Sequence, residues 1–246
     1  MLIYDIADLR VGIKNEHPYT TRFCEKYLSP DQNAPIDMLA SVTQEDIEQE
    51  RQQSPGFSAG YIENICLYRS MCLQMPARNR MLLHAAILEY DGAAYAFLGR
   101  SGTGKSTHTG LWLKHVEGSK ILNGDKPILK IDDSGVMVYG TPWMGKEGRG
   151  YNSKAPLKGL CFLEQAKVNA IRRLSPAEAA SRLFMQILLP SEVEAAGKTL
   201  ELADKLITTV PAWLLSCDIS EEAVAKSFEA LTEKNYSKTI SEKIDL

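Results

Sequence analysis

A glycine-rich segment near the middle of the chain constrains the fold more than any other feature. Residues 98–113 read LGRSGTGKSTHTGLWL, and Gly99 together with Gly104, Lys105 and Ser106 matches the pattern G-x-x-x-x-G-K-[ST]. In a loop of this kind, backbone N–H groups hold phosphate oxygens, the lysine reaches the β and γ phosphates, and the hydroxyl binds Mg²⁺. The pattern requires a strand before the loop and a helix after it.

Both flanks of the loop fit that requirement. Residues 95–98 form a short apolar run before the first glycine, and residues 107–116 place three apolar side chains at helical spacing. The N-terminus of such a helix adds free N–H groups and a positive dipole end to the phosphate site. The sequence therefore predicts a nucleotide-binding loop made by Gly99, Ser101, Gly102, Thr103, Gly104, Lys105, Ser106 and Thr107.

Composition narrows the class of protein and of partner. The 246 residues carry a formal net charge of −3, without a local excess of lysine and arginine. A nucleic-acid or acidic-membrane surface requires such an excess, so we expect neither partner. No apolar run approaches the length of a membrane span, and the N-terminus lacks the pattern of a secretory leader, which predicts a cytoplasmic protein. The five scattered cysteines are expected to be reduced thiols in the core.

Turn signals and periodicity divide the chain into three predicted parts. Residues 1–77 are expected to form a structural layer or small subdomain, residues 78–235 the phosphate-loop domain, and residues 236–246 a polar tail. In the first part the expected elements are strands at 2–4, 11–13 and 36–42, a helix after a capping box at 43–46, and a longer helix over 58–75.

The phosphate-loop domain alternates strand and helix patterns, which predicts the α/β class. Two apolar runs at 81–88 and 93–98, joined by the turn dipeptide Asp91-Gly92, predict a hairpin whose second strand leads into the loop. Further strands are expected at 120–122, 128–131, 136–139, 157–163, 170–174 and 210–217, and helices at 175–190, 192–206 and 220–234.

A carboxylate that helps to hold Mg²⁺ is expected at a neighbouring strand end. Asp125 follows a short apolar strand 20 residues beyond Lys105, so Ser106 and Asp125 are the expected metal ligands. The alternative for Asp125 is a turn residue without a chemical role. Asp132 and Asp133 are weaker candidates, because their surroundings have the composition of a hairpin turn.

Two segments resemble the HPr kinase/phosphorylase catalytic domain. His84 begins the run HAAILEYDG, 21 residues before Lys105, and FLGRSGTGKS follows it. The loop is also similar to that of ATP-dependent phosphoenolpyruvate carboxykinase, and LNGD at 122–125 resembles the second nucleotide motif of both families. The resemblance implies a P-loop kinase fold with a mixed, mostly antiparallel sheet and flanking helices. It also implies that His84 lies against the γ-phosphate and the metal and tunes the acid–base group.

A glycine-rich stretch at 140–150 is expected to be a functional loop. The segment around Arg149 loosely resembles the arginine-containing segment of HPr kinases. This resemblance implies that Arg149 closes on the transferring phosphoryl group. Lys146 and Lys154 are weaker candidates, with a solvated loop as the alternative, and Trp143 is expected to anchor the loop.

These features predict an ATP-dependent kinase that uses Mg²⁺ and transfers the γ-phosphoryl group to a hydroxyl, expected on a serine of a small protein or peptide. The expected catalytic residues are His84, Lys105, Asp125 and Arg149. The sequence indicates no second small-molecule pocket, and residues 1–75 are a candidate docking surface for a protein acceptor.

Two alternatives stay open. Both resembling families carry paired aspartates at the second motif, where this chain has only Asp125, so a nucleotide-binding regulator without transfer activity remains an interpretation. The second alternative is a kinase of small metabolites. The sequence leaves homo-oligomerisation undecided.

Overall fold

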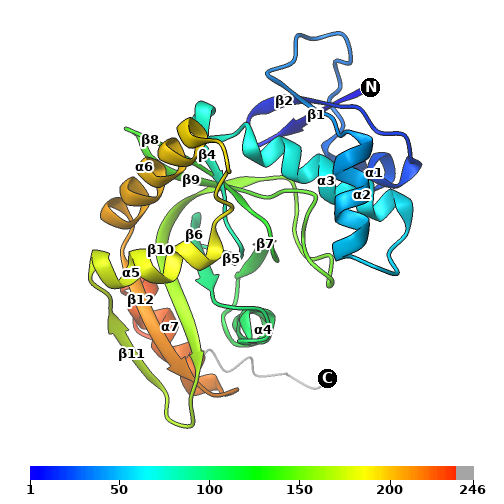
Figure 1. Ribbon diagram of the computed structural model, residues 1–246. Helices are drawn as coiled ribbons and strands as arrows, with labels where there is room; N and C mark the ends of the chain where they lie inside the picture. Colours follow the sequence, from blue (N-terminus) through cyan, green and yellow to red (C-terminus); the bar gives the residue numbers. More distant parts are fainter. Residues whose placement is uncertain (237–246) are drawn as a thin grey trace, which may run out of the picture.

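The computed structural model describes residues 1–236, which form two β-sheets with helices around them (Figure 1). The strands are β1 Leu2–Ile6, β2 Leu9–Ile13, β3 Met38–Ala40, β4 Arg80–Leu82, β5 Ala85–Tyr90, β6 Ala93–Leu98, β7 Lys120–Asn123, β8 Ile128–Asp132, β9 Gly135–Tyr139, β10 Lys154–Gln165, β11 Ala170–Arg173 and β12 Ala212–Cys217. The α-helices are α1 Pro18–Phe23, α2 Gln44–Gln53, α3 Ala59–Leu73, α4 Lys105–His115, α5 Pro176–Leu183, α6 Val193–Thr209 and α7 Glu221–Thr232. Apart from residue 236, the polar tail expected at 236–246 lies outside the described residues.

The larger sheet has nine strands and is organised around β10. Its order is β4-β8-β9-β10-β6-β5-β7, with β12 on β10 and β11 on β12. The start of β10 pairs antiparallel with β9, and its later residues pair parallel with β6 and with β12. The other strand pairs of this sheet, among the described residues, are antiparallel. The mixed α/β architecture expected from the sequence is therefore confirmed.

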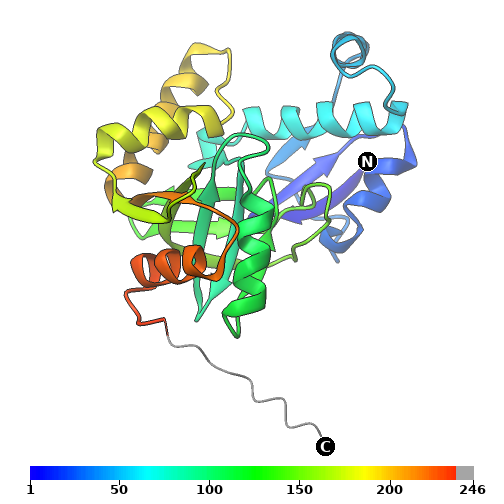
Figure 2. The ribbon, with the colours of Figure 1, turned by 90° about the horizontal axis from the view of Figure 1, so that it is seen from below.

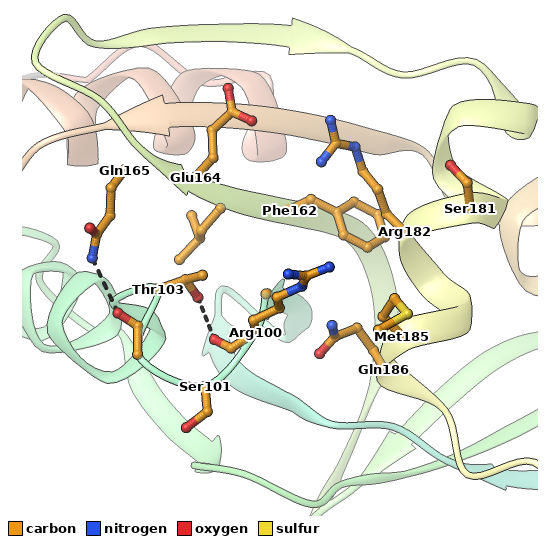
Figure 3. Close-up of a pocket in the computed structure, with 13 residues that line it drawn as sticks. Arg100, Ser101, Thr103, Phe162, Glu164, Gln165, Ser181, Arg182, Met185 and Gln186 are labelled. Atoms are coloured by element: carbon orange, nitrogen blue, oxygen red, sulfur yellow. Dashed lines mark hydrogen bonds between the residues drawn. The ribbon is translucent and has the colours of Figure 1, made fainter.

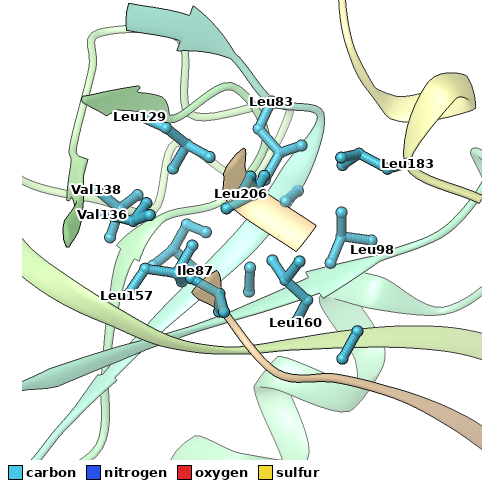
Figure 4. Close-up of a cluster of buried hydrophobic side chains, with 14 of the residues drawn as sticks. Leu83, Ile87, Leu98, Leu129, Val136, Val138, Leu157, Leu160, Leu183 and Leu206 are labelled. Carbon is cyan, nitrogen blue, oxygen red and sulfur yellow. The ribbon is translucent and has the colours of Figure 1, made fainter. Parts of the chain in front are cut away.

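Helices cover both faces of this sheet because its strands alternate apolar side chains between two cores. Leu98 and Ala96 of β6 point into one core with Leu183 of α5 and Leu206 of α6 (Figure 4). Phe97 and Tyr95 of the same strand point into the opposite core, which is completed by Trp112 of α4 and Phe228 of α7. A period of two along a strand places consecutive residues on opposite faces, so β6 is buried on both sides.

The N-terminal part and α6 pack on opposite faces of β8 and β9, with Ile128 and Tyr139 in one core and Leu129 and Val138 in the other (Figures 1 and 2). Strands β1, β2 and β3 form a separate three-stranded sheet that packs with α3. The apolar cluster beneath them continues into Ile128, Tyr139 and Trp143, and Arg80 Nε donates a hydrogen bond to the Ala7 carbonyl oxygen at 2.8 Å. The division of the chain at residue 77 remains a prediction.

Local sequence signals placed the helix starts well. The expected capping box is present at Thr43, whose side chain accepts from the Asp46 N–H while the Asp46 carboxylate accepts from the Thr43 N–H. Ser175 and Glu178 make a second capping box before α5, with Pro176 at the first helical position. All five cysteines lie among the described residues and are free thiols, four of them buried. Within residues 1–236, no helix is long and apolar enough to span a membrane.

Two sequence predictions about element boundaries were wrong. The strand expected over 81–88 is divided in two, because the Leu83 N–H donates to Pro127 and the His84 N–H donates to the Gln186 carbonyl at 2.7 Å. As a result β4 pairs with β8 while β5 pairs with β6 and β7. The helix expected over 175–190 ends at Leu183 and is followed by a 3₁₀ turn, Phe184–Gln186, after which Ile187 is extended.

A buried histidine on α4 has a lowered pKa. His108 Nε2 lies 3.0 Å from Ser227 Oγ, which also accepts from Trp112 Nε1 at 2.8 Å. His108 Nδ1 is buried and has no hydrogen-bond partner among the described residues. Burial disfavours the charged imidazolium and lowers the pKa of His108 to about 4.

The stability of the protein is therefore expected to fall in mild acid. The folded-state pKa of His108 lies below its ordinary value of 6.5, so the unfolded chain takes up the proton first and stability is lost as pH falls below that value. At about pH 5 we expect a loss of about 2 kcal/mol from this group. Urea unfolding at about pH 7 and about pH 5 measures the difference. His108→Gln retains an N–H for Ser227 without titrating, and an equally large pH dependence in that variant would contradict the assignment.

Candidate functional site

The glycine-rich loop lies between β6 and α4, in the order that its sequence pattern requires. Gly104 precedes the first residue of α4 with φ 102°, and Gly102 has φ 83°, both in the left-handed region that favours glycine. A Cβ atom on Gly99 would lie 2.5 Å from Thr103 Oγ1, so this position also requires a residue without a side chain. The loop thus turns the chain sharply from the strand into the helix N-terminus.

Lys105 lies across this loop with its ammonium group on the loop's own carbonyl groups. Its Nζ donates to the Gly99 carbonyl oxygen at 2.8 Å and lies 3.4 Å from that of Arg100. Burial lowers the pKa of Lys105, and the charge of Asp125 acts in the opposite direction. A buried ammonium at the centre of a loop rich in N–H groups is suited to bind a polyanion.

Asn123 organises the turn that carries Asp125. Its Oδ1 accepts from the N–H groups of Asp125 at 3.0 Å and Lys126 at 2.8 Å, and its Nδ2 donates to the Thr141 carbonyl at 3.1 Å. Asn123 is fully buried, so these bonds replace those it would make with water. The side-chain hydrogen bonds that hold this turn are therefore made by Asn123, and Asp125 lines the cavity.

Asp125 and His84 form an ion-pair geometry at the edge of the phosphate loop. His84 Nε2 lies 3.1 Å from Asp125 Oδ1, with both side chains about 29% exposed. Burial acts to raise the pKa of Asp125, but the His84 hydrogen bond and the charges of Lys126 and Lys105 outweigh it, so the net shift is downward. The carboxylate is therefore ionised at neutral pH and available as a metal ligand or proton acceptor.

One cavity of about 420 Å³ brings together most of the residues singled out in the sequence. Of those residues, the ones that line it are His84, Ser101, Gly102, Gly104, Lys105, Ser106, Thr107, Asp125, Lys146 and Arg149. Gly99 and Thr103 line a second cavity on the other flank of the loop. Lys154 lies elsewhere, paired with Asp8 at 2.6 Å, and Asp132 is in a hairpin turn paired with Lys130.

The glycine-rich stretch that contains Arg149 is anchored at its start. Trp143 is buried, its Nε1 donates to Asn64 Oδ1 at 3.0 Å, and its ring lies 4.5 Å from that of Tyr68 on α3. Arg149 itself is exposed, and its Nε lies 3.3 Å from a Glu147 carboxylate oxygen. The expected anchor is confirmed, and the arginine lies on an exposed part of the loop at the rim of the cavity.

A divalent cation at this site would depend on oxygens from the ligand. Within residues 1–236, no group of three or more His, Cys, Asp or Glu side chains could hold a metal ion by itself. Ser106 and Asp125 supply one hydroxyl and one carboxylate in the same cavity. Mg²⁺ is commonly bound by one or two such groups together with waters and substrate phosphates, so this donor set fits a magnesium–nucleotide complex.

Sequence reasoning missed two residues of this site. Asn123 sets the direction of Asp125, and an Asn two residues before an Asp in N-G-D is the signal that could have revealed it. Gln186, whose carbonyl oxygen accepts the His84 N–H, is 102 residues away in the sequence from that histidine, and no local pattern connects them.

Comparisons with known proteins give matches in structure but none to a family model or a curated sequence. No protein-family model matches the chain, and no curated protein matches its sequence. Among solved structures, the chain is similar to the Hpr(Ser) kinase/phosphatase from Coxiella burnetii, at 15% sequence identity and a TM-score of 0.34, over 62% of this chain and 88% of that one.

Proposed function

We propose that the chain is an ATP-dependent phosphotransferase that acts on a hydroxyl group. The observation that carries the proposal is the ionised Asp125, 3.1 Å from His84, in one cavity with Lys105 and Ser106 at the N-terminus of α4. This set combines a phosphate-binding loop, a metal-binding donor pair and a candidate base. If the turn at Asp125 had no chemical role, its carboxylate would have no reason to line the same cavity as Lys105.

The residues have distinct roles in the proposed reaction. Lys105 and the loop N–H groups neutralise the β and γ phosphates. Ser106 and Asp125 are the residues that would hold Mg²⁺, which would supply further charge neutralisation. The acceptor oxygen forms the new bond to the γ phosphorus while the bond to the β–γ bridging oxygen breaks, and ADP leaves. Asp125, alone or with His84, accepts the hydroxyl proton. Arg149 closes over the charge of the transferring group.

The identity of the acceptor defines the main alternatives. A serine of a small protein or peptide is the acceptor that we expect from the sequence, and a small metabolite is the runner-up. A nucleotide-binding regulator is a third interpretation, because the second motif contributes a single aspartate. The cytoplasmic location and any homo-oligomer remain predictions.

Labelled nucleotide tests the proposal directly. The full chain is incubated with γ-labelled ATP, Mg²⁺ and a lysate of its own cells, and protein and small-molecule fractions are then separated. We expect label in one of the two fractions, and that fraction identifies the acceptor class. Tight ATP binding by calorimetry, with no ADP formed over hours in the presence of the lysate, would establish the regulator instead.

Gly124 offers a test of the geometry that leaves every charged group in place. A Cβ atom there would lie 2.6 Å from the Met144 carbonyl oxygen and 3.2 Å from that of Arg149, so Gly124→Ala forces the Asp125 turn and the glycine-rich loop apart. We expect phosphoryl transfer to fall about 10²-fold, as for a displacement of about 1 Å at a reacting group. Gly197→Ala on α6 is the matched control, because nothing lies within 4 Å of its added Cβ. Equal transfer rates in the two variants would contradict the proposed contact.

A further inference from the structure

A second cavity of about 590 Å³ lies on the other flank of the phosphate loop (Figure 3). Its walls are the first half of the loop, the end of β10, and the end of α5 with the 3₁₀ turn that follows. Nothing in the sequence indicated this second cavity. The sequence could not reveal this cavity because its walls come from three segments that are far apart in the chain.

Two arginines line this cavity. Arg100 extends from the phosphate loop and Arg182 from α5, which form different walls (Figure 3). Within residues 1–236, neither has an acidic side chain within ion-pair distance. The one carboxylate of the lining, Glu164, accepts a hydrogen bond from Ser216. Two unpaired guanidinium groups favour an anionic ligand, because each can donate two parallel hydrogen bonds to a carboxylate or phosphate.

A buried amide in the same cavity also lacks a partner. Gln186 is 6% exposed, and its Oε1 has no hydrogen-bond partner among the described residues. Its side chain points from the 3₁₀ turn toward the phosphate loop (Figure 3). An unpaired buried oxygen costs free energy unless a donor reaches it, so this atom favours a ligand with an N–H or O–H group. The backbone of Gln186 holds His84, which connects this wall to the Asp125 pair.

The two cavities meet at the start of the phosphate loop. Ser101 and Gly102 line both of them, whereas Ser106, Thr107 and Thr109 line only the cavity of Asp125. The second cavity therefore adjoins the first residues of the loop, on the flank away from Ser106, Thr107 and Thr109.

We infer that this cavity is the acceptor subsite and that it takes a small hydroxyl-bearing anion. Arg100 and Arg182 bind the carboxylate or phosphate of the acceptor. Gln186 Oε1 accepts a hydrogen bond from an N–H or O–H group of the acceptor, and the acceptor's free hydroxyl extends past Ser101 toward Asp125. The inference rests on the proposed phosphotransferase function and selects a small metabolite over a peptide as the acceptor.

Three probes of similar size separate charge from shape. Glycerate carries a carboxylate, glycerol 3-phosphate carries a phosphate, and glycerol carries neither. Binding to the full chain is measured by calorimetry with Mg²⁺ and a non-hydrolysable ATP analogue present. We expect glycerate or glycerol 3-phosphate to bind at least about 10-fold more tightly than glycerol, and the tighter of the two identifies the anion.

Arg182→Gln is the decisive variant, with Arg173→Gln as its matched control. Arg173 lies over the Trp213 ring on β12 and lines neither cavity. We expect Arg182→Gln to lose the preference for the anion while the affinity for the ATP analogue is unchanged, and Arg173→Gln to retain both. The inference is overturned if all three probes bind equally or not at all. It is also overturned if Arg182→Gln weakens the ATP analogue, since the cavity would then hold the nucleoside.

The readout separates this inference from the proposed function. Anion preference is measured by binding alone and requires no transfer, whereas the phosphotransferase proposal is tested by the formation of ADP. Equal binding of the three probes by a chain that still transfers phosphate to a lysate component would reject the acceptor subsite and leave the phosphotransferase in place.

Discussion

Asp125→Asn is expected to reduce phosphoryl transfer by about 10³-fold, with little change in the stability of the fold. The substitution removes the charge that would help to bind Mg²⁺ and the oxygen that accepts the acceptor's proton. A positioned general base alone contributes about 10²–10⁴-fold. Asparagine has nearly the same shape, and its Oδ1 can still accept the hydrogen bond from His84, so the turn held by Asn123 is retained.

Transfer is measured as ADP formed in the presence of the acceptor fraction. Asp133→Asn is the control, because that carboxylate is fully exposed and pairs only with Lys205 among the described residues. Equal rates for Asp125→Asn and the unmodified chain would reject the role of Asp125.

The same carboxylate sets an expected acid limit on activity. The pKa of Asp125 is lowered below its ordinary value of 3.8, so the reactive, ionised form persists through neutral pH and is lost only as pH falls through the lowered pKa. A pH profile of phosphoryl transfer in which Asp125 loses its charge at or above the ordinary pKa of 3.8 would contradict the lowered pKa.

Lys105→Ala is the second substitution with a large expected effect. The Lys105 ammonium lies within the loop, 2.8 Å from the Gly99 carbonyl oxygen, and a single charged donor at a phosphate is worth about 10²–10³-fold in rate. We therefore expect the affinity for ATP and the rate of transfer both to fall by about 10²-fold or more. Direct titration of ATP by calorimetry measures the first, and ADP formation the second.

The structural control for Lys105→Ala is its unfolding free energy. Alanine removes the hydrogen bonds to Gly99 and Arg100 but also removes a buried charge, whose burial lowers the pKa of the lysine. These contributions oppose each other, so we expect the unfolding free energy to change by no more than about 1 kcal/mol. Unaltered ATP affinity in a folded Lys105→Ala protein would reject the phosphate site.

The parts of the fold encoded in local patterns were predictable from the sequence. The loop between β6 and α4, the hairpin of β5 and β6 with its Asp91-Gly92 turn, and the capping boxes each depend on residues that are neighbours in the chain. The meeting of His84, Lys105 and Asp125 followed from a resemblance to known kinases, and the structure places all three around one cavity.

Contacts between distant segments were not predictable in the same way. The break between β4 and β5 depends on hydrogen bonds from Leu83 to Pro127 and from His84 to Gln186, and apolar periodicity cannot register either bond. The end of α5 at Leu183 and the second cavity could not be predicted from the sequence either. Both depend on how the 3₁₀ turn packs beside the phosphate loop.

The rates at which the free thiols are alkylated report on local unfolding of the chain. Thiolates are the reactive form of cysteine, and burial raises the pKa of Cys24 and Cys72 to about 12 and shifts the other three upward as well. Alkylation of the four buried thiols in the native protein therefore depends on segments that unfold transiently. Of these four, Cys24, Cys66 and Cys72 lie in residues 1–77, and Cys161 lies in the larger sheet. The order in which these two groups react records whether the predicted division of the chain is also a division in stability.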